Sequence, residues 1–372
     1  MTDLTASIAG ARRIVVKVGS RSIVGASLHE GATQGGGRFT QLGAQIAQLR
    51  GEGRSLVMVS SGAVALGRGR LGYEAKPKAI AELQACAAVG QTLLMQGWER
   101  ALGARSIAVG QLLLSHADLE DRERYLNARA ALDALIELGA VPIINENDTV
   151  AVDEIRFGDN DQLAAMVCTL AGADLLVLLS DVEGLLDADG GRVAQVDDIE
   201  LAQKLTFASA GDVGSGGMAS KLEAARRAAR RGVPVVIADA RDPEVLARIV
   251  RGEDVGTRVA PLGARMTSRK HWIAYTLRPR GDLLLDDGAV AAIRAGGRSL
   301  LPAGILGVRG DFGPGDPVVL RDARGIEIGR GLCRYAVSDA AKLAGAKTTE
   351  IEERLGFHGG DEVVHRDDLV VS

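Results

Sequence analysis

The stretch Val141-Pro142-Ile143-Ile144 is a short apolar run that breaks directly into Asn145-Glu146-Asn147-Asp148. A second polar group, Gly158-Asp159-Asn160-Asp161, follows a few residues later. An apolar strand that ends in amides and carboxylates is typical of the floor of a polar site. Carboxylates can hold an ammonium group, and Asn side chains can donate to a carboxylate or accept from an amine. The two motifs could therefore hold both ends of an amino acid, although an acidic, solvated loop with Asn and Asp in turn positions also explains them.

Apolar runs of the same kind recur along the first part of the chain: Ile14–Val18, Leu56–Val59, Ile107–Val109, Leu175–Leu179 and Val233–Ala238. Such runs are typical of strands that are buried on both faces of a parallel sheet. Stretches with helical periodicity lie between them: Phe39–Arg50, Ala79–Leu102, Arg122–Leu138 and Ala219–Arg231. This alternation predicts an α/β domain in which helices sandwich a mostly parallel sheet.

The pattern changes near residue 280, where short strand-like pieces are separated by the turn residues Asp286-Asp287-Gly288, Gly313-Pro314-Gly315 and Arg324-Gly325. The pieces are Leu283–Leu285, Ile305–Val308, Val318–Leu320, Ile326–Ile328 and Val363-Val364. Short strands at this spacing predict a small, mostly β, barrel-like domain. We therefore expect a first, α/β domain over residues 1–258, a linker over 259–279 and a second domain over 280–372.

Composition excludes several classes of protein. The 372 residues carry a net charge of −4, with 47% apolar and 25% charged residues, as in an ordinary globular protein. No apolar run is long enough to span a bilayer, and no secretory signal is present at residues 1–10. The three cysteines are far apart, which favours reduced thiols and a cytoplasmic protein. Residues 280–372 hold 12 Lys plus Arg and 15 Asp plus Glu, so we do not expect a nucleic-acid partner.

Two lysines are candidates for binding an anion at the ends of the predicted strands. Lys17 interrupts an apolar strand just before Gly19; it either contacts an anion or reaches water from an edge strand. Lys221 falls in the first turn of a helix, after the glycine-rich Gly214–Gly217, where the helix dipole disfavours a cation. A bound phosphate would explain both placements, although a flexible loop and a surface lysine would also explain Lys221.

Other phosphate-binding fingerprints are weak. Gly67–Gly72 matches G-x-G-x-x-G but does not directly follow a strand, so we interpret it as a loop and do not expect dinucleotide binding. No P-loop motif is present.

Several motifs together resemble the glutamate 5-kinases, a branch of the amino acid kinase family. The motifs are Val15–Ser20, Val59–Ala63, Glu120–Arg129, Ile144–Asp148, Gly158–Asp161 and Gly216–Lys221. The C-terminal part resembles a PUA domain through Asp287–Ala289, Ser299–Ile305 and Gly310. Ser60, Ser180 and Ser215 stand where relatives often carry Thr, and Ala219 replaces a hydroxyl residue, which puts a side-chain contact to phosphate at 219 in doubt.

The resemblance implies phosphorylation of the γ-carboxylate of L-glutamate by ATP with Mg²⁺, the first step of proline biosynthesis. It implies feedback inhibition by proline, a homo-oligomer and glutamate-5-phosphate reductase as a possible partner. Residue by residue, it implies glutamate binding by Ser61, Asp148 and Asn160, with Asn145 and Asp161 as weaker matches. ATP binding is implied for Lys17, Gly19, Ser180, Asp181, Ser215, Gly216, Gly217, Met218, Ala219, Ser220 and Lys221.

The chemistry agrees with this assignment, because phosphoryl transfer needs positioning and charge neutralisation more than covalent help. A carboxylate nucleophile is already ionised at neutral pH and requires no general base. We expect Lys17 and Lys221 to be catalytic and Asp181 to orient them. We assign no direct metal ligand and expect Mg²⁺ to be held mainly by the ATP phosphates, although Asp161 could take part. Two alternatives remain at this point, namely another amino acid kinase that acts on a different substrate and an RNA-binding PUA protein.

Overall fold

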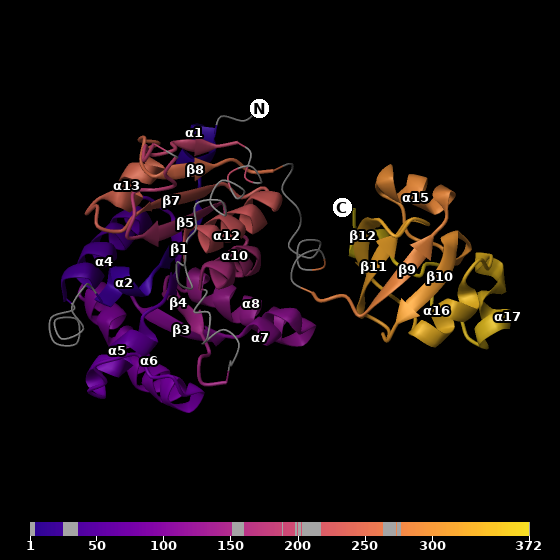
Figure 1. The fold of residues 1–372 in the computed structure, drawn as a ribbon, viewed down its shortest axis with the longest axis horizontal. Coiled ribbons are helices and arrows are strands. Elements are labelled where there is room, and N and C mark those ends of the chain that lie inside the picture. The colour runs from indigo at the N-terminus through magenta and orange to yellow at the C-terminus, as the bar shows by residue number, and fades with distance from the viewer. Residues whose placement is uncertain are drawn as a thin grey trace. The chain divides into compact units, whose positions relative to one another are not determined.

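The computed structural model describes residues 4–24, 36–150, 160–187, 189–197, 199, 202, 217–262, 273 and 277–371. The chain divides into two compact units, residues 1–265 and 266–372. Each unit has its own cluster of buried apolar side chains. Figure 1 shows the elements of both units. No helix in the described ranges is long and apolar enough to cross a membrane.

An eight-stranded sheet with the order β3-β4-β2-β1-β5-β7-β8-β6 forms the centre of the first unit. Its strands are β1 (Arg13–Val18), β2 (Ser55–Ser60), β3 (Val109–Leu114), β4 (Val141–Glu146), β5 (Leu175–Ser180), β6 (Gln195–Val196), β7 (Val235–Asp239) and β8 (Thr257–Val259). The strands from β3 to β7 in this order pair in parallel, and β8 runs antiparallel to β7. The predicted mostly parallel sheet is confirmed.

Helices cover both faces of this sheet, as Figure 1 shows. One face packs on a core to which several helices contribute, namely α1 (Leu4–Ala9), α2 (Ser20–Val24), α4 (Gly36–Gly51), α5 (Ala63–Arg70), α6 (Ile80–Gly103) and α13 (Val245–Val250). The helices that pack against β1, β4, β5 and β7 from the other side are α8 (Arg122–Glu137), α10 (Asn160–Ala171) and α12 (Met218–Arg230). The short α7 (His116–Glu120) precedes α8.

The helices α5 and α6 cross at an unusually short distance. A Cβ added at Gly67 would lie 1.8 Å from Cys86 O, and one added at Gly90 would lie 1.7 Å from Ala63 O. Only glycine therefore fits at these two positions. The prediction of a loop at Gly67–Gly72 is wrong, because α5 continues to Arg70. The glycine at 67 permits a close helix contact and does not form a phosphate-binding turn.

The second unit is built on a five-stranded sheet with the order β10-β9-β11-β12-β13. Its strands are β9 (Gly281–Leu285), β10 (Ile305–Gly310), β11 (Pro317–Arg321), β12 (Glu327–Leu332) and β13 (Leu369–Val371). All pairs are antiparallel except β9 with β11. The expected strand at Val363-Val364 is only an isolated bridge between Val364 and Leu300.

The second unit contains three helices that were not predicted from its sequence: α15 (Asp287–Arg294), α16 (Val337–Leu343) and α17 (Ile351–Leu355). The residues Asp286-Asp287-Gly288 looked like a turn. In the structure Asp286 is the N-cap of α15, and its side chain accepts a hydrogen bond from Ala289 N at 2.7 Å. Asp favours turns and helix N-caps for the same reason, since its short side chain accepts from nearby backbone N–H groups.

Candidate active site

Three charged side chains from three elements meet on one side of β1. The carboxylate of Asp161 lies between the two lysines, with Oδ1 2.5 Å from Lys17 Nζ and Oδ2 3.2 Å from Lys221 Nζ. Lys17 and Lys221 are each 6% exposed, and Asp161 is 1% exposed. Buried charges are costly unless they are paired. We call these three side chains the charged centre; together they carry one positive charge, which favours an anion beside them.

Strand alternation explains why Lys17 faces α10 and α12. Ile14, Val16 and Val18 belong to the apolar core on one face of the sheet, so Lys17 projects from the opposite face. The strand β1 lies in the middle of the sheet, paired with β2 on one side and β5 on the other. This position rules out the alternative that Lys17 is an edge-strand lysine that reaches water.

Two helix N-termini complete the charged centre. Asp161 is the second residue of α10, and 11 of the 12 residues of this helix are buried. A carboxylate in the first turn is favoured by the helix dipole. Lys221 is the fourth residue of α12, and this helix packs against α10. Ser220 Oγ also lies 3.4 Å from Asp161 Oδ2, so the start of α12 is joined to Asp161 by two side chains.

The pKa of Asp161 is lower than that of an ordinary aspartate. Burial acts to raise this pKa, but the charges and hydrogen bonds of Lys17 and Lys221 outweigh it. Asp161 is therefore a carboxylate at neutral pH, and each of its oxygens faces an ammonium group. We expected Asp181 to orient the lysines, and the structure places Asp161 between them instead.

A pocket of amide and hydroxyl groups lies at the carboxyl ends of β2 and β4. Asn160 Nδ2 donates to Ser61 Oγ at 2.6 Å and to Asn145 Oδ1 at 2.9 Å. Ser61 follows β2, Asn145 lies in β4, and Asn160 begins α10 next to Asp161. The polar residues that follow separate strands in the sequence are thus in direct contact. Gly62, with φ of 117°, starts α5 in a conformation that favours glycine.

This pocket has a volume of about 120 Å³, and Asp148 also lines it. Its other lining residues include Ser20, Lys76 and Glu146, which sequence analysis did not assign. Glu146 is 4% exposed, and its Oε1 lies 3.7 Å from His116 Nδ1. Lys76 is exposed at the rim of the pocket, where a cation can meet a substrate carboxylate. No local signal marked Lys76, because it lies in a polar connection far from the recognised motifs.

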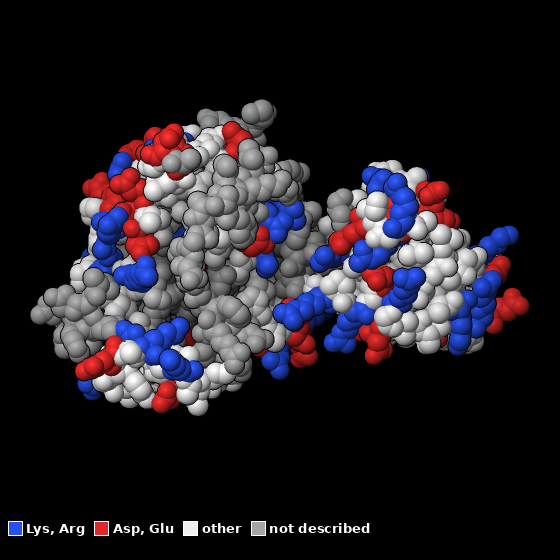
Figure 2. All heavy atoms as spheres, viewed as in Figure 1, with Lys and Arg blue, Asp and Glu red and all other residues white. Residues whose placement is uncertain are grey.

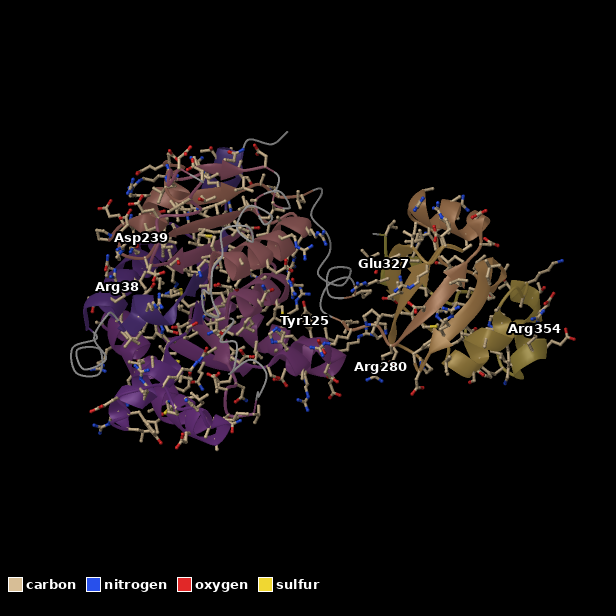
Figure 3. All side chains as sticks on the ribbon, viewed as in Figure 1. Arg38, Tyr125, Asp239, Arg280, Glu327 and Arg354 are labelled. Carbon is tan, nitrogen blue, oxygen red and sulfur yellow. The ribbon has the colours of Figure 1, made fainter. Side chains whose placement is uncertain are left out.

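The expected nucleotide side begins where β5 ends. Ser180 Oγ lies 3.3 Å from Asp181 Oδ1, and Arg21 Nη1 lies 3.3 Å from Asp181 Oδ2. Two residues further on, Glu183 lines a second polar pocket together with Asp239, the last residue of β7. Figure 3 labels Asp239 and Arg38 on this edge of the first unit, where Arg38 Nη1 donates to Ala240 O at 2.8 Å.

The predicted ATP-binding residues are only partly described. Gly19 follows β1, Gly217 is the N-cap of α12, and the helix then begins with Met218, Ala219 and Ser220. The four residues Gly217, Met218, Ala219 and Ser220 are partly buried. Ser215 and Gly216 lie outside the described residues, as do residues 25–35.

The described residues contain no group of three or more His, Cys, Asp or Glu side chains that could hold a metal ion. Asp161, which could have taken part in magnesium binding, has its two oxygens at Lys17 and Lys221. Within the described residues, the donor set fits a Mg²⁺ carried by the phosphates of a nucleotide better than a metal held by protein side chains alone.

Comparison with known proteins identifies the family. The amino acid kinase family model matches residues 12–239, and the PUA domain model matches residues 281–355. The chain is 46% identical over 377 residues to a glutamate 5-kinase of Myxococcus xanthus (strain DK1622), which covers 98% of this chain and 97% of the relative. It belongs to the glutamate 5-kinase family.

Other members of the glutamate 5-kinase family are equally similar. A glutamate 5-kinase of Pseudomonas aeruginosa (strain UCBPP-PA14) is 47% identical over 374 residues, covering 98% of this chain and 99% of that protein. Among solved structures, a carbamate kinase from Giardia lamblia bound to AMP-PNP covers 68% of this chain and 100% of its own, with 16% identity and a TM-score of 0.49. The resemblance seen in the motifs is thus confirmed at the level of the family.

Proposed function

We propose that this chain transfers the γ-phosphoryl group of ATP to the γ-carboxylate of L-glutamate and forms L-glutamyl 5-phosphate and ADP. This reaction is the first step of proline biosynthesis. One observation carries the proposal: Asn160 in the amide pocket and Asp161 in the charged centre are consecutive residues. A site for an amino acid therefore adjoins a site for an anion.

The reaction needs no general base at this site. An oxygen of the substrate carboxylate, which is ionised at neutral pH, attacks the γ-phosphorus, and the bond to the β,γ-bridging oxygen breaks. Negative charge on the transferred group and on the leaving ADP is stabilised by Lys17 and Lys221. Asp161 holds both ammonium groups in place, so their position is fixed before the substrates bind.

The pocket residues fit the two ends of glutamate. Ser61, Asn145 and Asn160 supply neutral hydrogen-bonding groups, and Asp148 supplies a negative charge for the substrate ammonium group. On the nucleotide side we propose Gly19, Ser180, Asp181 and residues 215–221 as the ATP contacts. Magnesium, bound to the ATP phosphates, neutralises part of their charge.

We also propose the finer assignments that the family resemblance implies. Residues 1–258 carry catalysis, and the linker over 259–279 leads to the PUA domain over 280–372. Proline acts as a feedback inhibitor near the glutamate pocket, and the enzyme is a cytoplasmic homo-oligomer. Because an acyl phosphate is labile, a reductase such as glutamate-5-phosphate reductase consumes the product.

The alternative of an RNA-binding function has little support in the second unit. Its residues 280–372 are net acidic, and on the face that Figure 2 shows, Lys and Arg are interspersed with Asp and Glu. Nucleic-acid-binding domains instead gather cations on one face.

The test is a panel of carboxylates incubated with MgATP, which includes L-glutamate, L-aspartate, N-acetyl-L-glutamate and glutarate. We expect ADP release with L-glutamate, accompanied by an acyl phosphate that hydroxylamine traps as the hydroxamate. ADP release without a hydroxamate, or preference for another member of the panel, would contradict the proposal.

A further inference from the structure

The amide groups around the pocket form one continuous hydrogen-bonded chain. Asn160 Nδ2 donates to Asn145 Oδ1 at 2.9 Å, and Asn145 Nδ2 donates to Gln91 Oε1 at 2.9 Å. Gln91 Nε2 then donates to Gln111 Oε1 at 3.1 Å. The three donating amides, those of Asn160, Asn145 and Gln91, use their NH₂ groups in the same direction, away from the pocket and toward β3. Turning over one amide would place two donors or two acceptors face to face, so all four residues together set the direction of this amide chain.

This direction decides which atom of Asn160 is available to a ligand. Its Nδ2 is occupied by Ser61 Oγ and Asn145 Oδ1. Asn160 is only 8% exposed, its Oδ1 is buried, and no described residue donates a hydrogen bond to this oxygen. A buried carbonyl oxygen of this kind is stabilised by a ligand that brings a donor. If the amide chain had the opposite direction, Asn160 would offer its NH₂ group to the ligand instead, and an NH₂ donor cannot accept a hydrogen bond from an ammonium group.

Gln91 is held in place by the close crossing of α5 and α6. It follows Gly90, whose missing side chain lets α6 approach Ala63 O at the start of α5. The helix α5 in turn begins two residues after Ser61. The two helices therefore fix Gln91 relative to the pocket as a rigid pair.

We propose that Gln91 is a positioning residue that fixes the direction of this amide chain, so that Asn160 presents its carbonyl oxygen to the ammonium group of the amino-acid substrate. Gln91 acts through Asn145. Asp148 supplies the charge that attracts the ammonium group, and Asn160 supplies a directed acceptor. The inference rests on the proposed function, because the ammonium group is that of glutamate.

The experiment compares two substitutions at Gln91 with a matched control on the same helix. Gln91→Met keeps the length of the side chain and removes both amide groups. Gln91→Glu keeps an acceptor for Asn145 Nδ2, loses the donation to Gln111 at the exposed end of the amide chain and adds a negative charge there. Gln96→Met makes the first of these changes at an exposed glutamine of α6. For each full-length variant we measure kcat, the KM values for glutamate and ATP, the Ki of glutarate as a competitor of glutamate, and the Tm.

We expect Gln91→Met to raise the KM for glutamate about tenfold, the effect of weakening a hydrogen bond to a charged group. The Ki of glutarate, which has both carboxylates but no ammonium group, and the KM for ATP should stay within about twofold, because neither ligand uses this acceptor. Gln91→Glu should keep the KM for glutamate within about threefold of the wild-type value, and Gln96→Met should resemble the wild type.

The results separate this inference from the proposed function. A wild-type enzyme that does not phosphorylate glutamate would overturn the proposed function. If the wild-type enzyme phosphorylates glutamate but Gln91→Met weakens the binding of glutamate and of glutarate equally, Gln91 has a general structural role and the inference is overturned. An unchanged KM for glutamate in Gln91→Met, or an equal loss in Gln91→Glu, would overturn it as well.

Discussion

Lys17 Nζ lies 2.5 Å from Asp161 Oδ1, and both side chains are almost completely buried. The two residues come from the central strand β1 and from the N-terminus of α10. Lys221 meets the other oxygen of the same carboxylate. The loss of Asp161 would therefore leave two buried ammonium groups near one another without this counter-charge, and the effect should be seen in both stability and catalysis.

The first prediction concerns Asp161→Asn and its dependence on pH. At pH 7 this variant should unfold with a free energy lower by about 3 kcal/mol, the usual effect of breaking a buried ion pair. Because the pKa of Asp161 is lowered in the folded state, its contribution to stability is present above the unfolded value of about 3.9 and is lost as the pH falls through the lower folded value. Urea unfolding at several pH values should show the two proteins converging below about pH 4. A constant difference down to pH 2 would contradict this account.

The second prediction concerns the two lysines. Lys17→Ala and Lys221→Ala should each lower kcat by about two to three orders of magnitude, because each removes a charge that stabilises the transferring phosphoryl group. The KM values should change much less. Steady-state kinetics with glutamate and ATP check this, with Lys78→Ala as a control at an exposed lysine outside both pockets. An unchanged kcat in either variant would remove that lysine from the mechanism.

The central strands could be predicted from sequence because strands buried on both faces need nearly continuous apolar runs. Lys17 stood out for the same reason, since it breaks such a run. The predicted runs are confirmed as β1, β2, β4, β5 and β7, with changes only at their ends. By contrast, the predicted run Ile107–Val109 overlaps β3 only at Val109. The strand itself continues to Leu114, and most of its residues are partly exposed. That strand lies at the edge of the sheet and lacks the burial that makes a run apolar.

Roles that depend on tertiary contacts left no comparable signal. Asp161 ends a recognised motif and Asp181 follows a predicted strand, and only the packing of α10 against β1 and α12 shows which of them lies between the lysines. Gln91 lies in the middle of a long helix, and its contact with Asn145 depends on how α6 crosses α5. Local sequence patterns do not encode such crossings, which are set by two glycines far apart in the chain.

The third prediction concerns Asp148, which lines the amide pocket. Asp148→Asn should raise the KM for glutamate at least tenfold, because it removes the charge that meets the substrate ammonium group. The KM for ATP should remain nearly the same. The variant should also be less sensitive to proline, if proline competes near this pocket. Kinetics with and without proline test both points: equal losses for both substrates would indicate a folding defect, and retained proline sensitivity would indicate a separate regulatory pocket.

The fourth prediction concerns the crossing of α5 and α6. Gly67→Ala should lower the free energy of unfolding by about 1–3 kcal/mol, because the new methyl group would lie 1.8 Å from Cys86 O and the helices must separate. Gly51→Ala is the matched control, since it also lies in a helix but has nothing within 4 Å of the new atom. That control should be neutral or slightly stabilising. Equal stability of the two variants in urea unfolding would show that the crossing can relax.

The last prediction concerns the second unit. Every residue of the charged centre and of the amide pocket lies in the first unit, whose apolar core ends at Val250, whereas the core of the second unit begins at Leu283. Among the described residues, no side chain belongs to both cores. A chain that ends at residue 265 should therefore fold cooperatively and still phosphorylate glutamate, with kcat lowered less than about tenfold, because no contact to the transition state is removed. Thermal unfolding and the hydroxamate assay, run beside the full-length enzyme, check both parts. A truncated chain that folds cooperatively but is inactive would mean that the second unit contributes to catalysis, and residues 266–372 would then have to supply a group that the charged centre and the amide pocket lack.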